Sequence, residues 1–84
     1  MTIEEAKQKL DQGGTVALHL PARDRYVEAW YSMWINDHAE YVCSAKYLYY
    51  EPKLIAGSKD WDNFLRALPL VIKQNRTWEV SHHG

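Results

Sequence analysis

The sequence predicts a small α+β domain in the element order α-β-β-β-α-β, with an antiparallel sheet built on a long aromatic hairpin. Residues 25–51 hold 8 of the chain's 11 aromatic residues, and aromatic residues are enriched in β-strands. Large apolar side chains occupy every second position of residues 15–20, as in a half-buried strand. In residues 61–72 they recur at the spacing of a helix. With 46% hydrophobic residues the chain can form one core, so we expect a single compact domain over 1–84 that frays at 81–84.

A helix opens the chain. Thr2 is its predicted N-cap, and Glu5 three residues later completes a capping box. Gly13 and Gly14 then end the helix, as glycine does at many helix C-termini. The apolar stripe of this helix is narrow, so we expect it to lie on the body of the domain rather than at its centre. The strand at residues 15–20 follows and stops at Pro21, which cannot donate a backbone hydrogen bond to a sheet.

The central hairpin, about residues 25–50, has one apolar face. Its odd-numbered residues are mostly apolar on both arms: Val27, Ala29, Tyr31, Met33 and Ile35 on the first, and Ala39, Tyr41, Cys43, Ala45, Tyr47 and Tyr49 on the second. They share a face only if odd residues pair with odd residues. A three-residue loop at 36–38 gives that pairing, with Ile35 opposite Ala39. The same register sets Glu28 opposite Lys46, a favourable pair of opposite charges.

A helix is the competing interpretation of the first arm, residues 25–35. Glu28, Ser32 and Asn36 recur every four residues and would form a polar stripe on a helix. Such a helix would be apolar around most of its circumference, whereas the aromatic residues suit a strand. We therefore expect a strand and keep the helix as the alternative.

A second helix is predicted over about residues 58–74, after a loop at 53–57. Its apolar residues recur at helical spacing: Trp61, Phe64, Leu65, Leu68, Val71 and Ile72. Pro69 removes one backbone hydrogen bond, so the helix should kink there or break into two. Its apolar stripe has to be buried, and the small residues of the odd face of the hairpin leave room for it. A last short strand is expected over residues 77–81, with Trp78 pointing inward.

Composition argues against several classes of function. The chain has 10 Lys and Arg and 11 Asp and Glu, which are interspersed, so it lacks the basic stripe typical of phosphate binding. No apolar run approaches the roughly 20 residues of a membrane-spanning helix, and we expect no membrane contact. The lone cysteine, Cys43, cannot form an internal disulfide and fits a reducing compartment, which favours a cytoplasmic protein. We interpret Cys43 as a small core residue rather than a nucleophile.

The sequence lacks the usual catalytic and metal-binding motifs. It has no glycine-rich phosphate loop, serine elbow or metal-spaced cluster, so we expect no cofactor, no metal and no enzymatic activity. His38 lies in the predicted loop with Asp37 and Glu40, and these residue types suit acid–base catalysis or metal binding. A polar turn is the simpler interpretation. A small hydrolase that uses His19 or His38 stays as an alternative.

The even face of the hairpin is the predicted working surface. Trp30 and Trp34 lie on it and, if both helices pack on the odd face, stay open to solvent. An open aromatic patch with a charged rim is the composition of an interface hot spot. The alternative is that the first helix or the loop at 51–57 covers this face. The predicted partner-binding residues are Tyr26, Glu28, Trp30, Trp34, Lys46 and Leu48.

These observations favour a small non-enzymatic protein that binds a protein partner through its aromatic sheet face. Domains of this size without catalytic motifs are often inhibitors, blockers or antitoxin-like factors, including those of phage or mobile elements. A homodimer would occupy the same face with a second copy. The main alternative is a nucleic-acid or nucleotide-binding domain that stacks bases on Trp30 and Trp34.

Overall fold

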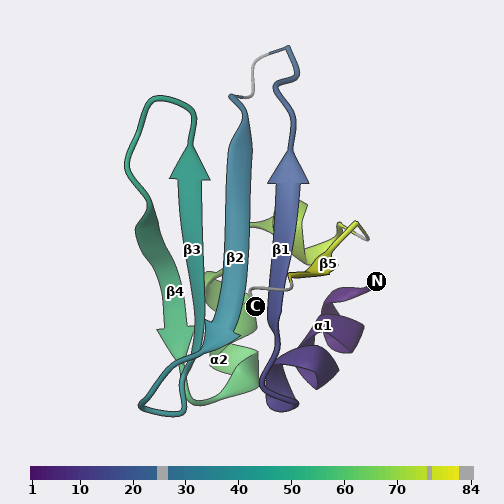
Figure 1. The fold of residues 1–84 in the computed structure, drawn as a ribbon, viewed down its shortest axis with the longest axis vertical. Helices are drawn as coiled ribbons and strands as arrows, with labels where there is room; N and C mark the ends of the chain where they lie inside the picture. The colour runs from purple at the N-terminus through teal and green to yellow at the C-terminus, as the bar shows by residue number, and fades with distance from the viewer. Residues whose placement is uncertain (25–26, 76, 82–84) are drawn as a thin grey trace.

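The computed structural model describes residues 1–24, 27–75 and 77–81, and Figure 1 traces the chain through them. The elements are α1 (Ile3–Asp11), β1 (Thr15–Leu20), β2 (Ala29–Ile35), β3 (Tyr41–Tyr47), β4 (Lys53–Ser58), α2 (Trp61–Ala67), α3 (Leu70–Lys73) and β5 (Glu79–Ser81). The five strands of the described residues form one antiparallel sheet in the order β4-β3-β2-β1-β5. The predicted α+β class is confirmed, and the first arm of the hairpin is strand β2 rather than a helix.

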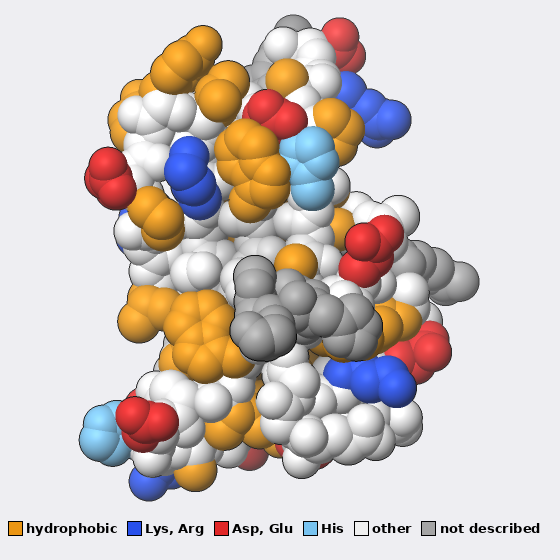
Figure 2. Space-filling view, viewed as in Figure 1, with side chains coloured by type: hydrophobic (Ala, Val, Ile, Leu, Met, Phe, Trp, Pro, Cys, Tyr) orange, Lys and Arg blue, Asp and Glu red, His pale blue; other side chains and the backbone are white. Residues whose placement is uncertain are grey.

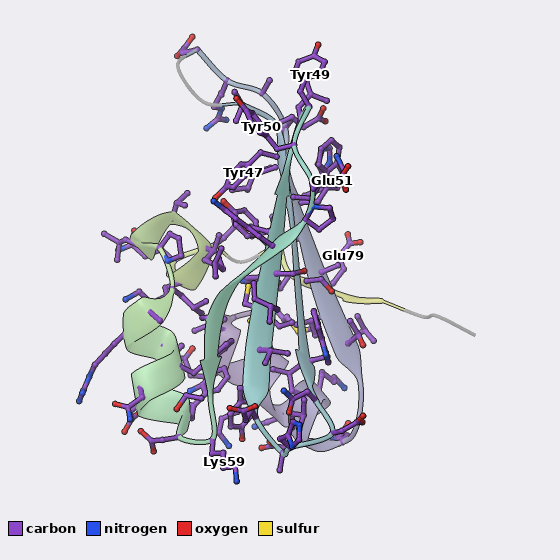
Figure 3. All side chains as sticks on the ribbon, turned by 90° about the vertical axis from the view of Figure 1, so that its left-hand side faces the viewer. Tyr47, Tyr49, Tyr50, Glu51, Lys59 and Glu79 are labelled. Carbon is purple, nitrogen blue, oxygen red and sulfur yellow. The ribbon has the colours of Figure 1, made fainter. Side chains whose placement is uncertain are left out.

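The helices lie on one face of the sheet, which we call the inner face. Figure 3 shows α2 and α3 to one side of the strands. The core combines Ile3, Ala6, Leu10, Phe64, Leu68 and Ile72 from the helical layer with Val16, Leu18, Ala29, Tyr31, Met33, Cys43 and Ala45 from the strands. The strand residues of this core from β2 and β3 are the odd-numbered ones, so the second helix packs on the face that the sequence predicted for it.

Helix α2 and helix α3 replace the single helix predicted over residues 58–74. Ser58, where the predicted helix begins, is the last residue of β4; the N-cap of α2 is Asp60, whose Oδ2 accepts a hydrogen bond of 3.0 Å from the N–H of Asn63. Leu68 ends α2 with an extended ψ of 140°. Pro69 is the cause, because proline disfavours the helical conformation of the residue before it. The predicted break at Pro69 is confirmed.

Strand β4 corrects the predicted order, which had three strands before the second helix and a loop in place of β4. It pairs with β3 and forms one edge of the sheet. The pairing shifts between Cys43 and Ser44, which marks a β-bulge. A bulge interrupts the alternation of side chains by which a strand is recognised in a sequence. The sequence pattern therefore missed this strand.

The faces of the central hairpin are as predicted, but its register differs by two residues. Odd residues pair with odd residues, since Tyr31 lies opposite Ala45. Trp30, and not Glu28, lies opposite Lys46. The predicted pairing of Glu28 with Lys46 is therefore wrong, whereas the assignment of residues to the two faces is right.

The loop of the hairpin explains the difference in register. It spans residues 37–39, one residue later than predicted. The backbone N–H of Asn36 donates a hydrogen bond of 3.0 Å to the carbonyl of Glu40, so these two residues still pair and the loop begins after them. The side-chain oxygen of Asn36 accepts hydrogen bonds from the backbone N–H groups of His38 (2.9 Å) and Glu40 (3.0 Å). Ala39 adopts a left-handed φ of 60°, a conformation for which glycine is the usual residue. No glycine marks this position, so the sequence carried no clear signal for the loop.

Trp78 fastens the C-terminal strand to the body of the domain. Its side chain is buried, and its indole N–H donates a hydrogen bond of 3.1 Å to the carbonyl of Ile72. A buried indole N–H needs such a partner. Strand β5 follows directly and pairs with β1, with Val80 opposite Val16. The predicted inward orientation of Trp78 is confirmed, although the strand begins at Glu79.

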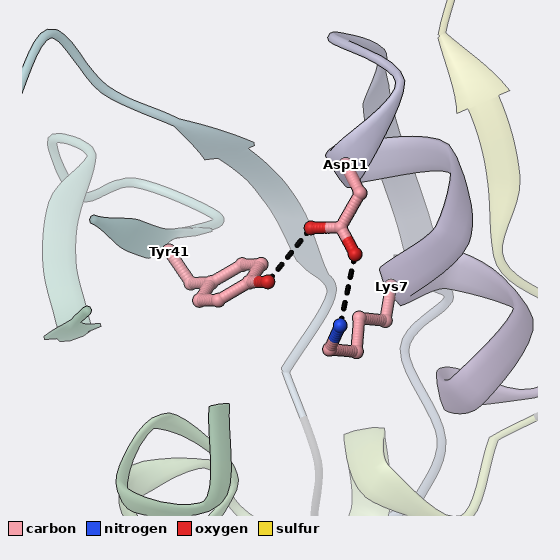
Figure 4. A network of polar contacts seen from close by, with 3 residues as sticks. All are labelled: Lys7, Asp11 and Tyr41. Carbon is pink, nitrogen blue, oxygen red and sulfur yellow. Dashed lines mark hydrogen bonds and ion pairs between the residues drawn. The ribbon is translucent and has the colours of Figure 1, made fainter. Parts of the chain in front are cut away.

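A polar network joins α1 to β3. Lys7 Nζ lies 2.8 Å from Asp11 Oδ2, and the hydroxyl of Tyr41 donates a hydrogen bond of 2.7 Å to Asp11 Oδ1 (Figure 4). The ammonium group of Lys7 also lies 5.8 Å and 6.0 Å from the ring centroids of Tyr41 and Trp61. The hydrogen bonds from Lys7 and Tyr41 hold the pKa of Asp11 below its usual range. The network thus links α1, β3 and the start of α2.

Asp11→Asn should lower stability at neutral pH but not in acid. A carboxylate whose pKa is lower in the folded state contributes stability above its unfolded pKa, about 4 for aspartate, and loses it as the pH falls through the folded pKa. We expect a deficit below about 1 kcal/mol at pH 7, because the network is exposed, and no deficit once Asp11 is protonated. Urea unfolding as a function of pH measures both values.

Tyr41→Phe is the matched variant for this measurement. It keeps the ring and removes one donor to Asp11, so it should lose part of the same pH-dependent stability. A deficit of Asp11→Asn that is equal at neutral and acidic pH would show that the network does not act through the charge of Asp11.

Candidate functional site

The outer face of the sheet, opposite the helices, carries the even-numbered side chains of the hairpin. Figure 2 shows this face, with hydrophobic, basic, acidic and histidine side chains lying together over the upper parts of β1, β2 and β3. Helix α1 does not cover it, because its buried residues belong to the inner-face core. Strand β4 extends the sheet at its edge instead of folding over the face.

A row of three side chains crosses the outer face at Trp30. Its cross-strand neighbours are His19 on β1 and Lys46 on β3. The imidazole of His19 stacks on the indole, with ring centroids 5.2 Å apart and an interplanar angle of 13°. Lys46 Nζ lies 5.1 Å from the centroid of the same ring. Because the two neighbours approach from opposite sides, both faces of the indole are occupied. We call His19, Trp30 and Lys46 the Trp30 row.

Glu28 fixes one end of the Trp30 row. Its Oε2 lies 2.6 Å from Nε2 of His19. The side chains of His19 and Glu28 are 49% and 28% exposed, so the pair adds little to stability. The contact with Glu28 instead orients the imidazole of His19 against the indole of Trp30. Glu28 therefore belongs to the predicted face, with His19 and not Lys46 as its partner.

A hollow of about 550 Å³ lies beside the Trp30 row. Its floor consists of small side chains that lie opposite one another on β1, β2 and β3: Ala17, Ser32 and Ser44. The Trp30 row forms one wall, and the other lining residues are Leu18, Tyr31, Pro52, Thr77 and Glu79. A recess of this size accepts a small molecule or a few large side chains.

Trp34 lies on the same face, and Leu48 follows the end of β3. Trp34 is half-buried and pairs with Val42 of β3, which is buried although it faces away from the helices. Leu48 is half-buried, and its N–H donates a hydrogen bond of 3.0 Å to the carbonyl of Glu28. Tyr26, also a predicted partner-binding residue, lies outside the described residues. Of the other five predicted residues, Glu28, Trp30, Trp34 and Lys46 belong to the outer face, and Leu48 lies next to Glu28 through its backbone.

The two histidines that are catalytic candidates from the sequence, His19 and His38, lie in different surroundings. His38 is exposed in the loop at 37–39, where its backbone N–H binds Asn36. His19 has Glu28 as its polar side-chain partner among the described residues. Within residues 1–24, 27–75 and 77–81, no group of three or more His, Cys, Asp or Glu side chains is placed to hold a metal ion.

The hollow was not predicted from the sequence. Glu79 reaches it from β5, and the position of β5 beside β1 cannot be read from periodicity. Ser32 and Ser44 carry no signal of their own. The order Trp30, Ser32, Trp34 along one strand could have indicated it, because these side chains share a face and alternate large, small, large.

Comparison with protein-family models, with curated proteins and with solved structures finds no match to this chain. No residue role can therefore be transferred from a relative. Within the outer face, the Trp30 row and the hollow are the features with the most specific geometry, and the function is inferred from them.

Cys43 belongs to the core, as predicted, and points away from the outer face. Its side chain is fully buried, and loss of solvation raises the pKa of its thiol to about 12. The reactive thiolate is therefore scarce at neutral pH. Its neighbour Ser44 lies on the opposite face of the same strand.

We expect the thiol of Cys43 to resist a thiol reagent in the native protein and to react after unfolding. Moving the thiol by one residue, in a variant that combines Cys43→Ala with Ser44→Cys, should accelerate native labelling more than about 100-fold. The new thiol would lie on the floor of the hollow. Labelling kinetics followed by absorbance measure the ratio, and similar native rates for the two proteins would contradict the assignment of the two faces.

Proposed function

We propose that this chain is a non-enzymatic protein-binding domain and that the outer face of its sheet is the docking surface. The observation that carries the proposal is the position of Trp30, which is held between His19 and Lys46 on the face of the sheet opposite helices α1, α2 and α3. Tryptophan contributes strongly to binding at protein interfaces. An indole that is already fixed by its neighbours loses little conformational entropy when a partner binds.

The surroundings of Trp30 also support a protein partner. Trp34, which is half-buried, adds apolar surface further along β2, and Lys46, Glu28 and Glu79 surround the face with charges of both signs. An apolar centre with a polar rim is the usual composition of a protein interface. The hollow offers a recess into which a partner's side chains can insert.

A nucleic-acid partner is less well supported. Base stacking requires a free aromatic face, and both faces of the Trp30 indole are occupied by His19 and Lys46. A base could stack there only after one neighbour moved away. The formal net charge of −1 also provides little attraction for phosphates.

A hydrolase is the other alternative, and the pair of His19 and Glu28 is the observation that would favour it. The pair lies at the edge of a hollow with two serines on its floor. In serine–histidine catalysis the histidine binds the nucleophile with one nitrogen and its orienting carboxylate with the other. Nε2 of His19 is taken by Glu28, and no described serine is hydrogen-bonded to the imidazole. We therefore favour binding over catalysis.

Binding without chemistry acts by masking or occupying a surface of the partner. We therefore propose the role of an inhibitor, blocker or antitoxin-like factor, of the kind that phage and mobile elements also use. The reduced, buried Cys43 suits action in the cytoplasm. In the part of the chain that the structure describes, no helix is long and apolar enough to cross a membrane.

Combining Trp30→Ser with Trp34→Ser should abolish capture of the partner from an extract of the source cells. Loss of a tryptophan at an interface hot spot costs at least about 2 kcal/mol, which is roughly a 30-fold loss of affinity. Pull-down on immobilised protein, quantified by mass spectrometry, measures the loss. Circular dichroism and thermal unfolding establish that the variant is folded.

Val71→Ser is the matched control. Val71 is an exposed apolar residue, but it belongs to α3 in the helical layer on the other side of the sheet. Its replacement should leave capture unchanged. Equal capture by the wild type and the double tryptophan variant would contradict docking through the outer face. Capture of nucleic acid that is lost at high salt would favour the nucleic-acid alternative.

A further inference from the structure

The outer face carries a projection and a recess side by side. The projection is the Trp30 row, and the recess is the hollow, whose floor includes Ser32. Ser32 follows Trp30 by two residues on β2, so the two features are about 7 Å apart along the strand. Their long directions are parallel, since each runs across β1, β2 and β3 through residues that lie opposite one another. The outer face therefore contains two features of complementary shape, the Trp30 row and the hollow.

A face with both features is able to bind a second copy of itself across a twofold axis. In a twofold dimer the same patch of both subunits meets, so that a projection on one copy contacts a recess on the other and the reverse contact forms at the same time. We consider an axis between two facing sheets that runs across the strands, midway between Trp30 and Ser32. This axis brings the Trp30 row of each copy over the hollow of the other. The two sheets then pack with their strands roughly aligned, a common arrangement for sheets that pack face to face.

We propose that the partner docked on the outer face is a second copy of this chain, in a twofold dimer in which each Trp30 row fills the hollow of the other copy. This inference rests on one part of the proposed function, that the outer face is a protein-docking surface, and it names a second copy as the occupant of that surface.

The sizes and charges of the two features agree with this arrangement. The hollow of about 550 Å³ has room for large side chains, and its floor residues are small. Glu79 lies beside Ala17 at the β5 end of the floor, and Ala17 would face His19 of the other copy. The dimer therefore brings a carboxylate close to an imidazole. Glu79 has no ion-pair partner among the described residues, so this contact would displace none.

The adjacency of the two features favours a second copy over an unrelated protein. An unrelated partner could use the Trp30 row or the hollow, but it would not require them to lie in neighbouring rows of one face. A twofold contact does require both features to lie on one face. The formal net charge of −1 gives little electrostatic repulsion between copies.

The first test is the solution mass of the wild-type protein across a range of concentrations, by light scattering and analytical ultracentrifugation. We expect the mass to rise from 9.9 kDa to twice that value as concentration increases. A mass that stays at 9.9 kDa up to the millimolar range would overturn the inference. It would leave the proposed function standing if the wild-type protein still captured another protein in the pull-down and the double tryptophan variant did not.

Two complementary variants test the fit itself. Trp30→Ser removes the projection, and Ser32→Phe fills the recess; each should raise the dimer dissociation constant at least about 30-fold, because each blocks both symmetry-related contacts. An equimolar mixture should recover a dimer. In that mixed dimer the intact Trp30 row of one copy enters the intact hollow of the other, and the added phenyl ring faces the space left by Trp30→Ser.

The outcomes separate the alternatives. Recovery of a dimer in the mixture, when neither variant dimerises alone, supports the arrangement. Dimerisation of both variants at wild-type strength would place the contact elsewhere and overturn it. Loss of dimerisation in each variant without recovery in the mixture would overturn the seating of the Trp30 row in the hollow. Val71→Ser should dimerise like the wild type, and thermal unfolding monitors the folding of every variant.

Discussion

The pleat of strand β2 is the constraint on which the rest of the structure depends. Successive side chains of a strand point to opposite faces, so Tyr31 and Met33 enter the core. Trp30, Ser32 and Trp34 then have to lie on the outer face. Strand β2 has β1 on one side and β3 on the other, and both must match its pattern. A shift of one residue would bury the tryptophans under the helices and expose the core to solvent.

The same strand sets the shape of the outer face. Side chains alternate large, small and large along β2, and the neighbouring strands continue each size across the sheet. Lys46 extends the large row of Trp30, and Ser44 extends the small row of Ser32. A fixed aromatic projection and a recess are thus produced by one alternating segment. The proposed docking surface and the proposed fit between two copies therefore depend on the same segment.

Local sequence patterns predicted much of this fold. The features that depend on contacts between distant segments were not predicted. The two faces of the hairpin, the break at Pro69 and the burial of Trp78 all follow from periodicity or from the chemistry of one residue. The loop could not be predicted because Ala39 takes a conformation typical of glycine. Strand β4 was missed because its bulge disrupts alternation. Four of the six predicted site residues, Glu28, Trp30, Trp34 and Lys46, lie on the outer face. The stacking of His19 on Trp30 was not predicted, because it depends on the register between β1 and β2, which no local pattern gives.

Hydroxyl-radical footprinting tests most directly whether the two faces of the sheet differ as described. It reports the solvent exposure of individual side chains by mass spectrometry and works in dilute protein, where self-association is weakest. We expect Trp30 and Trp34 to be oxidised in the native protein, whereas Trp78, which is buried and hydrogen-bonded to the carbonyl of Ile72, should be protected until the chain unfolds. Protection of Trp30 and Trp34 equal to that of Trp78 at every protein concentration would contradict it.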